Sequence, residues 1–342
     1  MIKRKKKNKE HNPFYDPTLK KRHLSAKRFK KFTLTSLIFS VAFLAFFLFD
    51  MIGKGIPAFN IAYIKVDVTF NEKTLEDTRF AVPTEYRNLV SRAALRDLPK
   101  LLEENPTYMN STQNIWILAS SQVDQYIKNH NHNLKDKDIA KVDELYAQGL
   151  IDKKFNAIFF ENGDSKIPEY AGIFSAVIGS ILTLIITMAV AFPIGVMTAI
   201  YLEEFALDNK FTRFIEININ NLAAIPSILF GLLGLAIFIN LFGMPRSSPL
   251  VGGLTLALMT LPIIIVSSRA ALRAVPDSIR QAGYGLGLNK IQVTKDHVLP
   301  LAFPGIMTGS IIGLAQAMGE TAPLIIIGMI AFIPDAPSMV TQ

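Results

Sequence analysis

The chain has 342 residues, of which 50% are hydrophobic, 24 are Phe and none is Cys, and its formal net charge is +8. The lack of cysteine excludes disulfide scaffolds, thiolate zinc sites and cysteine nucleophiles. Several nearly charge-free windows of about 20 residues have the length that spans a bilayer, which argues against a single-domain soluble enzyme.

The first feature in chain order is a basic tail, residues 1–31, with 13 Lys or Arg against Glu10 and Asp16. Such a run can bind nucleic acid or anionic lipid, or it can anchor a membrane helix on the cytoplasmic side. The apolar segment 32–52 follows at once, so we interpret the tail as a cytoplasmic anchor and expect a lipid bilayer but no nucleic acid as partner. This segment is longer than a signal-peptide core and precedes no small-x-small cleavage site, which indicates an uncleaved first transmembrane helix.

A long polar interval, residues 53–169, predicts a soluble α+β insert on the periplasmic side of the membrane. We predict strands at 61–70, which is rich in β-branched and aromatic residues, and at 155–160. We predict helices at 83–104, where apolar residues recur at helical spacing, and at 136–150. The histidines of the insert lack further candidate ligands, so no metal site is predicted.

The rest of the chain, 170–333, predicts a membrane-embedded core with four more apolar stretches, at 171–200, 222–242, 250–266 and 306–332. Basic residues are concentrated in the tail and in alternate short loops, which places the amino terminus in the cytoplasm. Five spans leave the final segment, 334–342, in the periplasm. The predicted fold class is an all-α transmembrane helical bundle with a soluble α+β periplasmic insert.

No nucleotide-binding or hydrolase motif is present: the sequence has no Walker loop, no His-Glu-x-x-His and no Gly-x-Ser-x-Gly. We therefore expect a chain that is not an enzyme, has no catalytic residues and binds no cofactor.

The most informative segment is the predicted cytoplasmic loop 270–303. Asp277 after Pro276 is typical of the start of a short helix, and Gly287 permits the turn that ends it. The small residues at 282 and 283 let another protein approach the backbone closely. These features suit a helix that docks on another protein. An ordinary loop between two membrane helices explains them equally well.

This loop resembles the EAA motif of ABC-transporter permeases, which implies that it couples the chain to an ATPase through Gln281, Ala282, Gly283, Gly287, Leu299 and Pro300. The sequence departs from the motif at Gln281, where the motif has Glu, at Gly283, where it has Ala, and at His297, where it has an aliphatic residue. Neighbouring segments such as YLEEF at 201–205 and GETAPL at 319–324 resemble permeases of the PstA type. The resemblance covers about 170–332 and implies a MetI-like permease fold.

The resemblance also implies a function: import of inorganic phosphate across the bacterial inner membrane by alternating access. The implied partners are a PstC-type permease, a PstB-type ATPase dimer that holds the ATP and Mg²⁺, and a periplasmic phosphate-binding protein. Such permeases have a sixth transmembrane helix after a periplasmic loop, so we expect a truncation within 334–342. Alternatives are a permease for molybdate or sulfate and, in a different class, a membrane-anchored sensor that binds its ligand in 53–169.

A second candidate site lies in the last apolar stretch, where Glu320 is the sole acidic residue. An ionisable group at that depth is costly unless it faces protein or water, so it marks a translocation pathway or a buried structural carboxyl. Pro323 frees backbone groups that can line such a pathway.

The resemblance implies an arginine one turn before Glu320, and this sequence has Gln316 there. Attraction of phosphate is then expected from a protonated Glu320, from Thr321 or from basic residues of the partner permease. Arg269, near the inner end of the fourth span, could guide the released anion, although a role in marking the inner face is the simpler interpretation.

Overall fold

The computed structural model describes residues 18–329 and 332–338. The start of the predicted basic tail and the end of the predicted final segment, 339–342, therefore lie outside the described residues. The chain divides into two compact units, residues 1–61 and 62–342, and each is described by itself.

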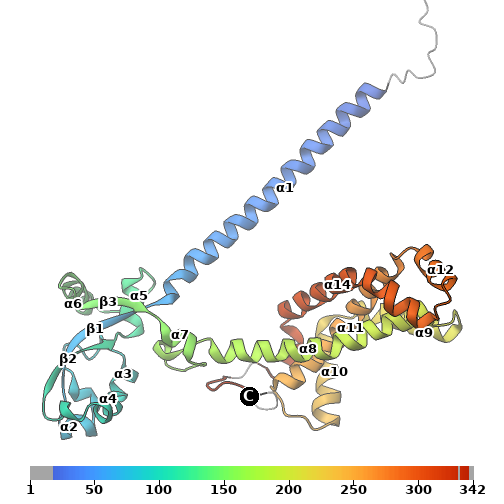
Figure 1. Ribbon diagram of the computed structural model, residues 1–342. Helices are drawn as coiled ribbons and strands as arrows, with labels where there is room; N and C mark the ends of the chain where they lie inside the picture. Colours follow the sequence, from blue (N-terminus) through green and yellow to red (C-terminus); the bar gives the residue numbers. More distant parts are fainter. Residues whose placement is uncertain (1–17, 330–331, 339–342) are drawn as a thin grey trace, which may run out of the picture. The chain divides into compact units, whose positions relative to one another are not determined.

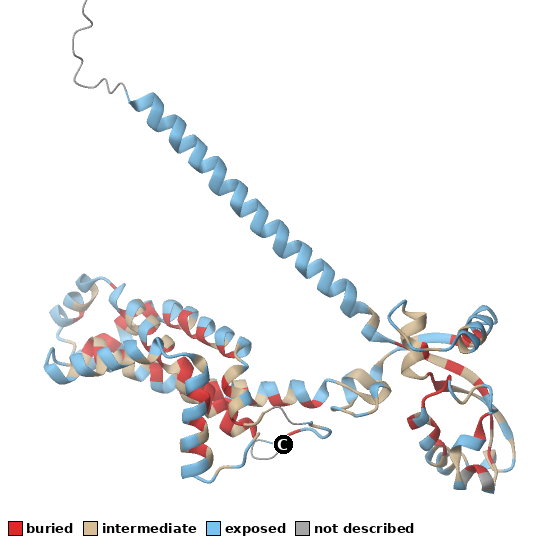
Figure 2. Cartoon of the chain, turned by 180° about the vertical axis from the view of Figure 1, so that it is seen from behind, coloured by how far each residue is buried: buried red, intermediate tan, exposed pale blue. Residues whose placement is uncertain are grey.

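In the first unit, helix α1 (Leu19–Gly55) contains the whole predicted span 32–52, and η1 (Ile56–Phe59) follows it. None of its residues is buried, as Figure 2 shows, although its apolar part is long enough to cross a membrane. A continuous helix of 37 residues is about 55 Å long, more than the hydrocarbon thickness of a bilayer. The basic residues from Lys20 to Lys31 continue the same helix beyond the apolar part.

The second unit begins with the insert, whose centre is a three-stranded sheet in the order β2-β1-β3 (Figure 1). Strand β1 (Asn60–Thr69) pairs in antiparallel fashion with β2 (Thr112–Leu118), and β3 (Ile151–Phe155) lies on its other side. Alternate residues of β1, from Ala62 to Val68, are at most 2% exposed and form the core of the insert with apolar residues of its helices.

Short helices surround this sheet: α2 (Glu72–Glu76), η2 (Thr78–Ala81), α3 (Arg92–Arg96), α4 (Leu98–Glu104), η3 (Pro106–Tyr108), α5 (Ser121–Ile127), α6 (Asp136–Ala147), α7 (Ala157–Glu161) and η4 (Pro168–Tyr170). The predicted strand at 61–70 and the predicted helix at 136–150 are confirmed by β1 and α6. The single helix predicted over 83–104 is instead a turn followed by α3 and α4, because Ser91 caps α3 and Pro99 lies in the first turn of α4.

The strand predicted at 155–160 is wrong. Strand β3 ends at Phe155, and the side chain of Asn156 then accepts a hydrogen bond from the Phe159 N–H at 3.2 Å. This N-cap starts α7, so the aromatic residues that suggested a strand lie on a helix.

The permease core consists of helices joined by short turns: α8 (Phe174–Ile200) with η5 (Tyr201–Phe205), α9 (Lys210–Ala223), α10 (Ser227–Gly234) with η6 (Leu235–Leu241), α11 (Pro249–Arg273), α12 (Asp277–Gly285), α13 (Lys290–Val293), η7 (Thr294–Val298), α14 (Leu299–Gly319) and α15 (Ala322–Ile326). Helix α11 is central and packs against α8 and α14 (Figure 1). Close packing depends on glycine: a Cβ at Gly253 would lie 2.6 Å from the Cβ of Ile186 on α8.

Among the described residues, four helices are long and apolar enough to cross a membrane: Leu19–Phe59, Phe174–Phe205, Pro249–Arg273 and Lys290–Gly319. A fifth span results if α9 and α10–η6, bent by 106°, are counted as one. Five spans were predicted, and most of the third, 222–242, lies on α10 and η6, after the bend.

The last span also differs from the predicted 306–332. Its helix begins at Lys290 and ends at Gly319, after which Glu320 is extended and α15 starts a new direction. The π turn η7 lies directly before Pro300, where a regular α-helical turn would clash with the proline ring. The helix therefore continues through Pro300 and Pro304.

Candidate functional site

Helix α12 contains the first three residues of the predicted coupling set (Figure 1). Gln281 and Ala282 are exposed, whereas Gly283 is buried against α13. A Cβ at position 283 would lie 2.8 Å from Cγ2 of Val293, which is only 1% exposed. The glycine that stands where the motif has alanine thus allows α12 to contact α13.

The turn after α12 has the geometry that the sequence predicts for Gly287. This residue has φ +80°, a left-handed conformation that glycine adopts without steric cost. Its N–H donates to the carbonyl of Tyr284, and the N–H of Leu288 donates to the carbonyl of Gly283. Together these two bonds form a Schellman motif, which ends α12 and directs the chain into α13.

The other two residues of the predicted set begin α14. Leu299 packs on the apolar cluster that joins the ends of α8, α11 and α14, whereas Pro300 is exposed. The six residues therefore do not form one surface: Gly283 and Leu299 face the protein, and the others are exposed.

An ion pair that the sequence analysis did not find fixes α12 to the membrane helices. Arg280 binds Glu204 of η5, with an Nη2–Oε1 distance of 2.7 Å, and the two side chains are 16% and 6% exposed. Arg280 also donates to the carbonyls of Leu272 at 3.0 Å and Val275 at 2.8 Å, at the end of α11. The hydrogen bond that Arg280 donates to Glu204 raises the pKa of Arg280, so the guanidinium remains charged.

Arg269 belongs to a neighbouring network of charges. Its guanidinium donates to Glu203 of η5 at 3.3 Å and to Glu216 of α9, and it is 13% exposed. Arg273 also binds Glu203, at 2.7 Å, but is 61% exposed. Arg269 therefore joins α11 to η5 and α9, which accounts for this arginine without a role in a pathway.

Glu320 lines a cavity of about 400 Å³ between α8, α11 and the junction of α14 with α15. Thr321 lines it too, together with Ser180 and Thr183 of α8 and Leu256 of α11. Among the described residues around this cavity, Glu320 is the only one that can carry charge. The arrangement can hold a small polar solute beside one carboxyl group and several hydroxyl groups.

The other three predicted pathway residues do not line this cavity. Gln316 is exposed on α14. Pro323 is buried against α10, where a Cβ at Gly231 would lie 2.8 Å from its Cα. Arg269 lies 13 residues beyond Leu256 on α11, about 20 Å along the helix axis, and is held by its own carboxylates.

Comparison with known proteins defines the class of this second half of the chain. Residues 191–337 match the family of binding-protein-dependent transport system inner membrane components. Residues 16–85 and 81–136 match a domain of unknown function (DUF3333). The matched residues include the apolar helix α11 and the α12 loop, so the second half of the chain is similar to the permease component of a binding-protein-dependent transport system.

Within this class, the chain is similar to the phosphate transport system permease protein PstA of Mycobacterium leprae, with 36% identity over 46% of this chain and 52% of that protein. The probable ABC transporter permease protein YqgI of Bacillus subtilis is 34% identical over 49% of this chain and 56% of its own. The chain spans about half the length of the curated relatives it matches. These similarities confirm the resemblance to PstA-type permeases.

Among solved structures, the inward-facing MetNI methionine ABC transporter matches 46% of this chain and 73% of its own, with a TM-score of 0.38 and 18% identity. The permease family and the mainly helical structure with a small sheet in the insert confirm the predicted fold class.

Proposed function

We propose that this chain is the membrane-spanning permease subunit of an ATP-driven importer of inorganic phosphate. It moves the anion from periplasm to cytoplasm by alternating access, and its amino terminus lies in the cytoplasm. The similarity to phosphate transport permeases supports the substrate. The observation that carries the coupling mechanism is the attachment of α12 to the ends of α8 and α11 through Arg280.

The proposed assembly contains a PstC-type permease, a PstB-type ATPase dimer on the cytoplasmic side and a phosphate-binding protein in the periplasm. The ATP and Mg²⁺ belong to the ATPase, and this chain itself binds no cofactor and catalyses no reaction. An exposed apolar surface on and beside α12 supports the contact with the ATPase, since Tyr284, Leu286 and Ile291 are 45%, 79% and 64% exposed.

Two routes carry motion of α12 into the membrane helices. The first runs through Arg280 and Glu204 into α8 and, through the carbonyls of Leu272 and Val275, into α11. The second runs from Gly283 to Val293 and along the helix from Lys290 to Gly319, which ends beside Glu320. Movement of packed helices at an interface is a common way to switch between two states.

Labelled-phosphate uptake by proteoliposomes that contain the full assembly tests this function. We expect uptake that requires ATP and the phosphate-binding protein, and that stops when the ATPase subunit is omitted. Full uptake without the ATPase would contradict the proposal. Uptake of molybdate or sulfate in place of phosphate would favour the alternative substrates.

Substitution of Glu320 tests the proposed pathway. A negative charge repels phosphate, so we infer that the charge of Glu320 is not what attracts the anion. Glu320→Gln is then expected to keep uptake within about twofold of the original chain, whereas Glu320→Ala loses a hydrogen-bonding group and falls about tenfold. Initial rates are measured at equal amounts of protein in the membrane. A larger loss in Glu320→Gln than in Glu320→Ala would show that the negative charge itself is required.

A further inference from the structure

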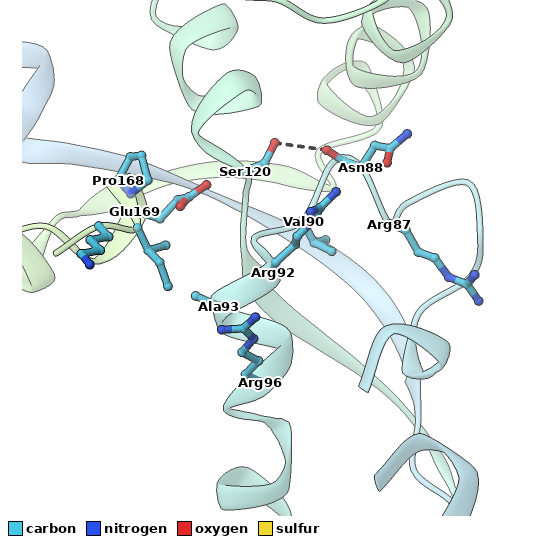
Figure 3. A pocket seen from close by; sticks show the side chains of 11 residues that line it. Arg87, Asn88, Val90, Arg92, Ala93, Arg96, Ser120, Pro168 and Glu169 are labelled. Carbon is cyan, nitrogen blue, oxygen red and sulfur yellow. Dashed lines mark hydrogen bonds between the residues drawn. The ribbon is translucent and has the colours of Figure 1, made fainter. Parts of the chain in front are cut away.

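The insert contains an arginine-lined hollow that the proposed transport mechanism does not use. Two adjoining cavities, of about 350 and 560 Å³, share Arg87, Asn88, Arg92 and Arg96 (Figure 3). Lys166 and Glu169 line the first cavity, and Asp77 and Arg79 line the second. We refer to these two cavities as the arginine cavity.

The two acidic residues of the arginine cavity are already bound. Asp77 accepts hydrogen bonds from the Arg79 guanidinium, with an Nη2–Oδ2 distance of 2.6 Å, and these bonds lower the pKa of Asp77 to about 2. Glu169 accepts a hydrogen bond from the Ser121 N–H, also at 2.6 Å. Asp77 is thus paired with Arg79 and also interacts electrostatically with Arg87, whereas Glu169 keeps its negative charge; the basic side chains of the cavity outnumber these two acids.

Four basic side chains of the cavity form no ion pair in the described part of the chain: Arg87, Arg92, Arg96 and Lys166. Concave surfaces lined by charges of one sign concentrate counter-ions. The cavity therefore has the electrostatic character of an anion site.

The arginines are placed by well-packed elements. Arg92 and Arg96 are four residues apart on α3, so they lie on one face of the helix, while Ala93 and Leu95 are buried on the other. Arg87 lies over the ring of Phe80, 4.9 Å from the ring centroid to Cζ, and donates to the carbonyl of Val82. Figure 3 shows Arg92 and Arg96 on α3 between Glu169 on one side and Arg87 on the other.

We propose that the arginine cavity binds anions with two or more phosphoryl groups. Guanidinium forks suit the paired oxygens of a phosphoryl group, and each fork can bind it through two hydrogen bonds. The volume of several hundred Å³ exceeds the needs of a single orthophosphate, so a chain of phosphoryl groups uses more of the arginines. Inorganic tripolyphosphate is the probe that matches this chemistry.

An anion bound in the arginine cavity would contact two separate parts of the chain. One wall, 166–169, includes the start of η4, only a few residues before α8. The hydroxyl of Tyr170, the last residue of η4, donates to Asp97, the residue after α3. A bound anion would add bridges between α3 and the segment that leads into α8.

Binding of tripolyphosphate to the purified full chain, measured by isothermal titration calorimetry at low ionic strength, tests the proposal. We expect saturable binding, tighter than that of orthophosphate or sulfate, and an affinity at least about tenfold lower in Arg92→Gln/Arg96→Gln. Arg92→Lys/Arg96→Lys keeps the charge without the fork and should lie between the two.

The matched control is Lys135→Gln/Lys137→Gln, which removes two exposed positive charges from the same insert, at the start of α6. This control should bind tripolyphosphate as the original chain does.

Three outcomes would overturn the proposal. They are absence of binding, an equal loss of affinity in Arg92→Gln/Arg96→Gln and in the lysine control, and binding of a glutamate-rich peptide without binding of tripolyphosphate. Circular dichroism checks that each variant is folded. The measurement involves no transport, so its result is independent of the proposed import function.

Discussion

Arg280→Gln is expected to reduce ATP-driven phosphate uptake at least about tenfold, the largest effect predicted for any single change in this chain. The substitution leaves Glu204 as a buried carboxylate without its partner, and it removes the donors to the carbonyls of Leu272 and Val275. Loss of one partner from a buried pair costs about 3–5 kcal/mol. Helix α12 would then no longer be fixed to α8 and α11. ATPase activity and uptake in proteoliposomes, measured side by side, should show hydrolysis uncoupled from transport.

A neighbouring arginine provides the control for this prediction. Arg273 also pairs with a glutamate of η5, but its side chain is 61% exposed, and pairs of this kind contribute about 0–1 kcal/mol. Arg273→Gln should therefore retain most of the uptake. Reversal of the pair, Arg280→Glu/Glu204→Arg, should not restore function, because the new carboxylate would face the carbonyls at the end of α11. Equal uptake by Arg280→Gln and Arg273→Gln would refute the proposed attachment.

Gly283→Ala is expected to lower both the stability of the α12 loop and the uptake rate. The added methyl group would lie 2.8 Å from Cγ2 of Val293, a buried and β-branched side chain that has little freedom to move. Overpacking of this kind typically costs about 1–3 kcal/mol. Thermal unfolding of the purified chain and phosphate uptake are the two measurements.

Gly285→Ala is the matched control on the same helix. Nothing lies within 4 Å of a Cβ at position 285, and alanine is the better helix former by roughly 0.5–1 kcal/mol. This variant should be at least as stable as the original chain and should transport normally. If Gly283→Ala/Val293→Ala, which removes the obstructing methyl groups, failed to improve on Gly283→Ala, contact between α12 and α13 would not be the cause.

Periodic and conformational signals in the sequence predicted several features well. The β-branched and aromatic residues of 61–70 identified β1, the helix predicted over 136–150 is α6, and the glycine at 287 has the left-handed conformation that its turn requires. Each of these signals is local, because it depends on residues within one element. Strand β2 lacked such a signal, since its sequence TQNIWIL begins with polar residues and was not predicted.

The charged contacts of the permease core could not be predicted in the same way. Arg280 and Glu204 are 76 residues apart, and each lies in a segment that also carries other charges. Only the packing of α8 against α11 brings them together. A charge that pairs across a tertiary contact leaves no periodic trace in the sequence.

A change in the backbone separates two of the predicted pathway residues. Gln316 and Glu320 would share a face if the helix continued, but α14 ends at Gly319 and Glu320 is extended, with φ −89° and ψ 117°. The rule that residues four apart are neighbours applies only inside a helix. Glu320 therefore faces the cavity with Thr321, while Gln316 remains on the outer surface of α14.

The single long helix from Lys290 to Gly319 has a mechanical consequence. Thirty residues make a rod of about 45 Å, with the α12 contact near one tip and Glu320 just past the other. A tilt of about 5° pivoting at Lys290 would sweep the opposite tip through about 4 Å. In the proposed import mechanism, a slight tilt at the α12 end of this helix would therefore be amplified into a larger displacement of the end beside Glu320.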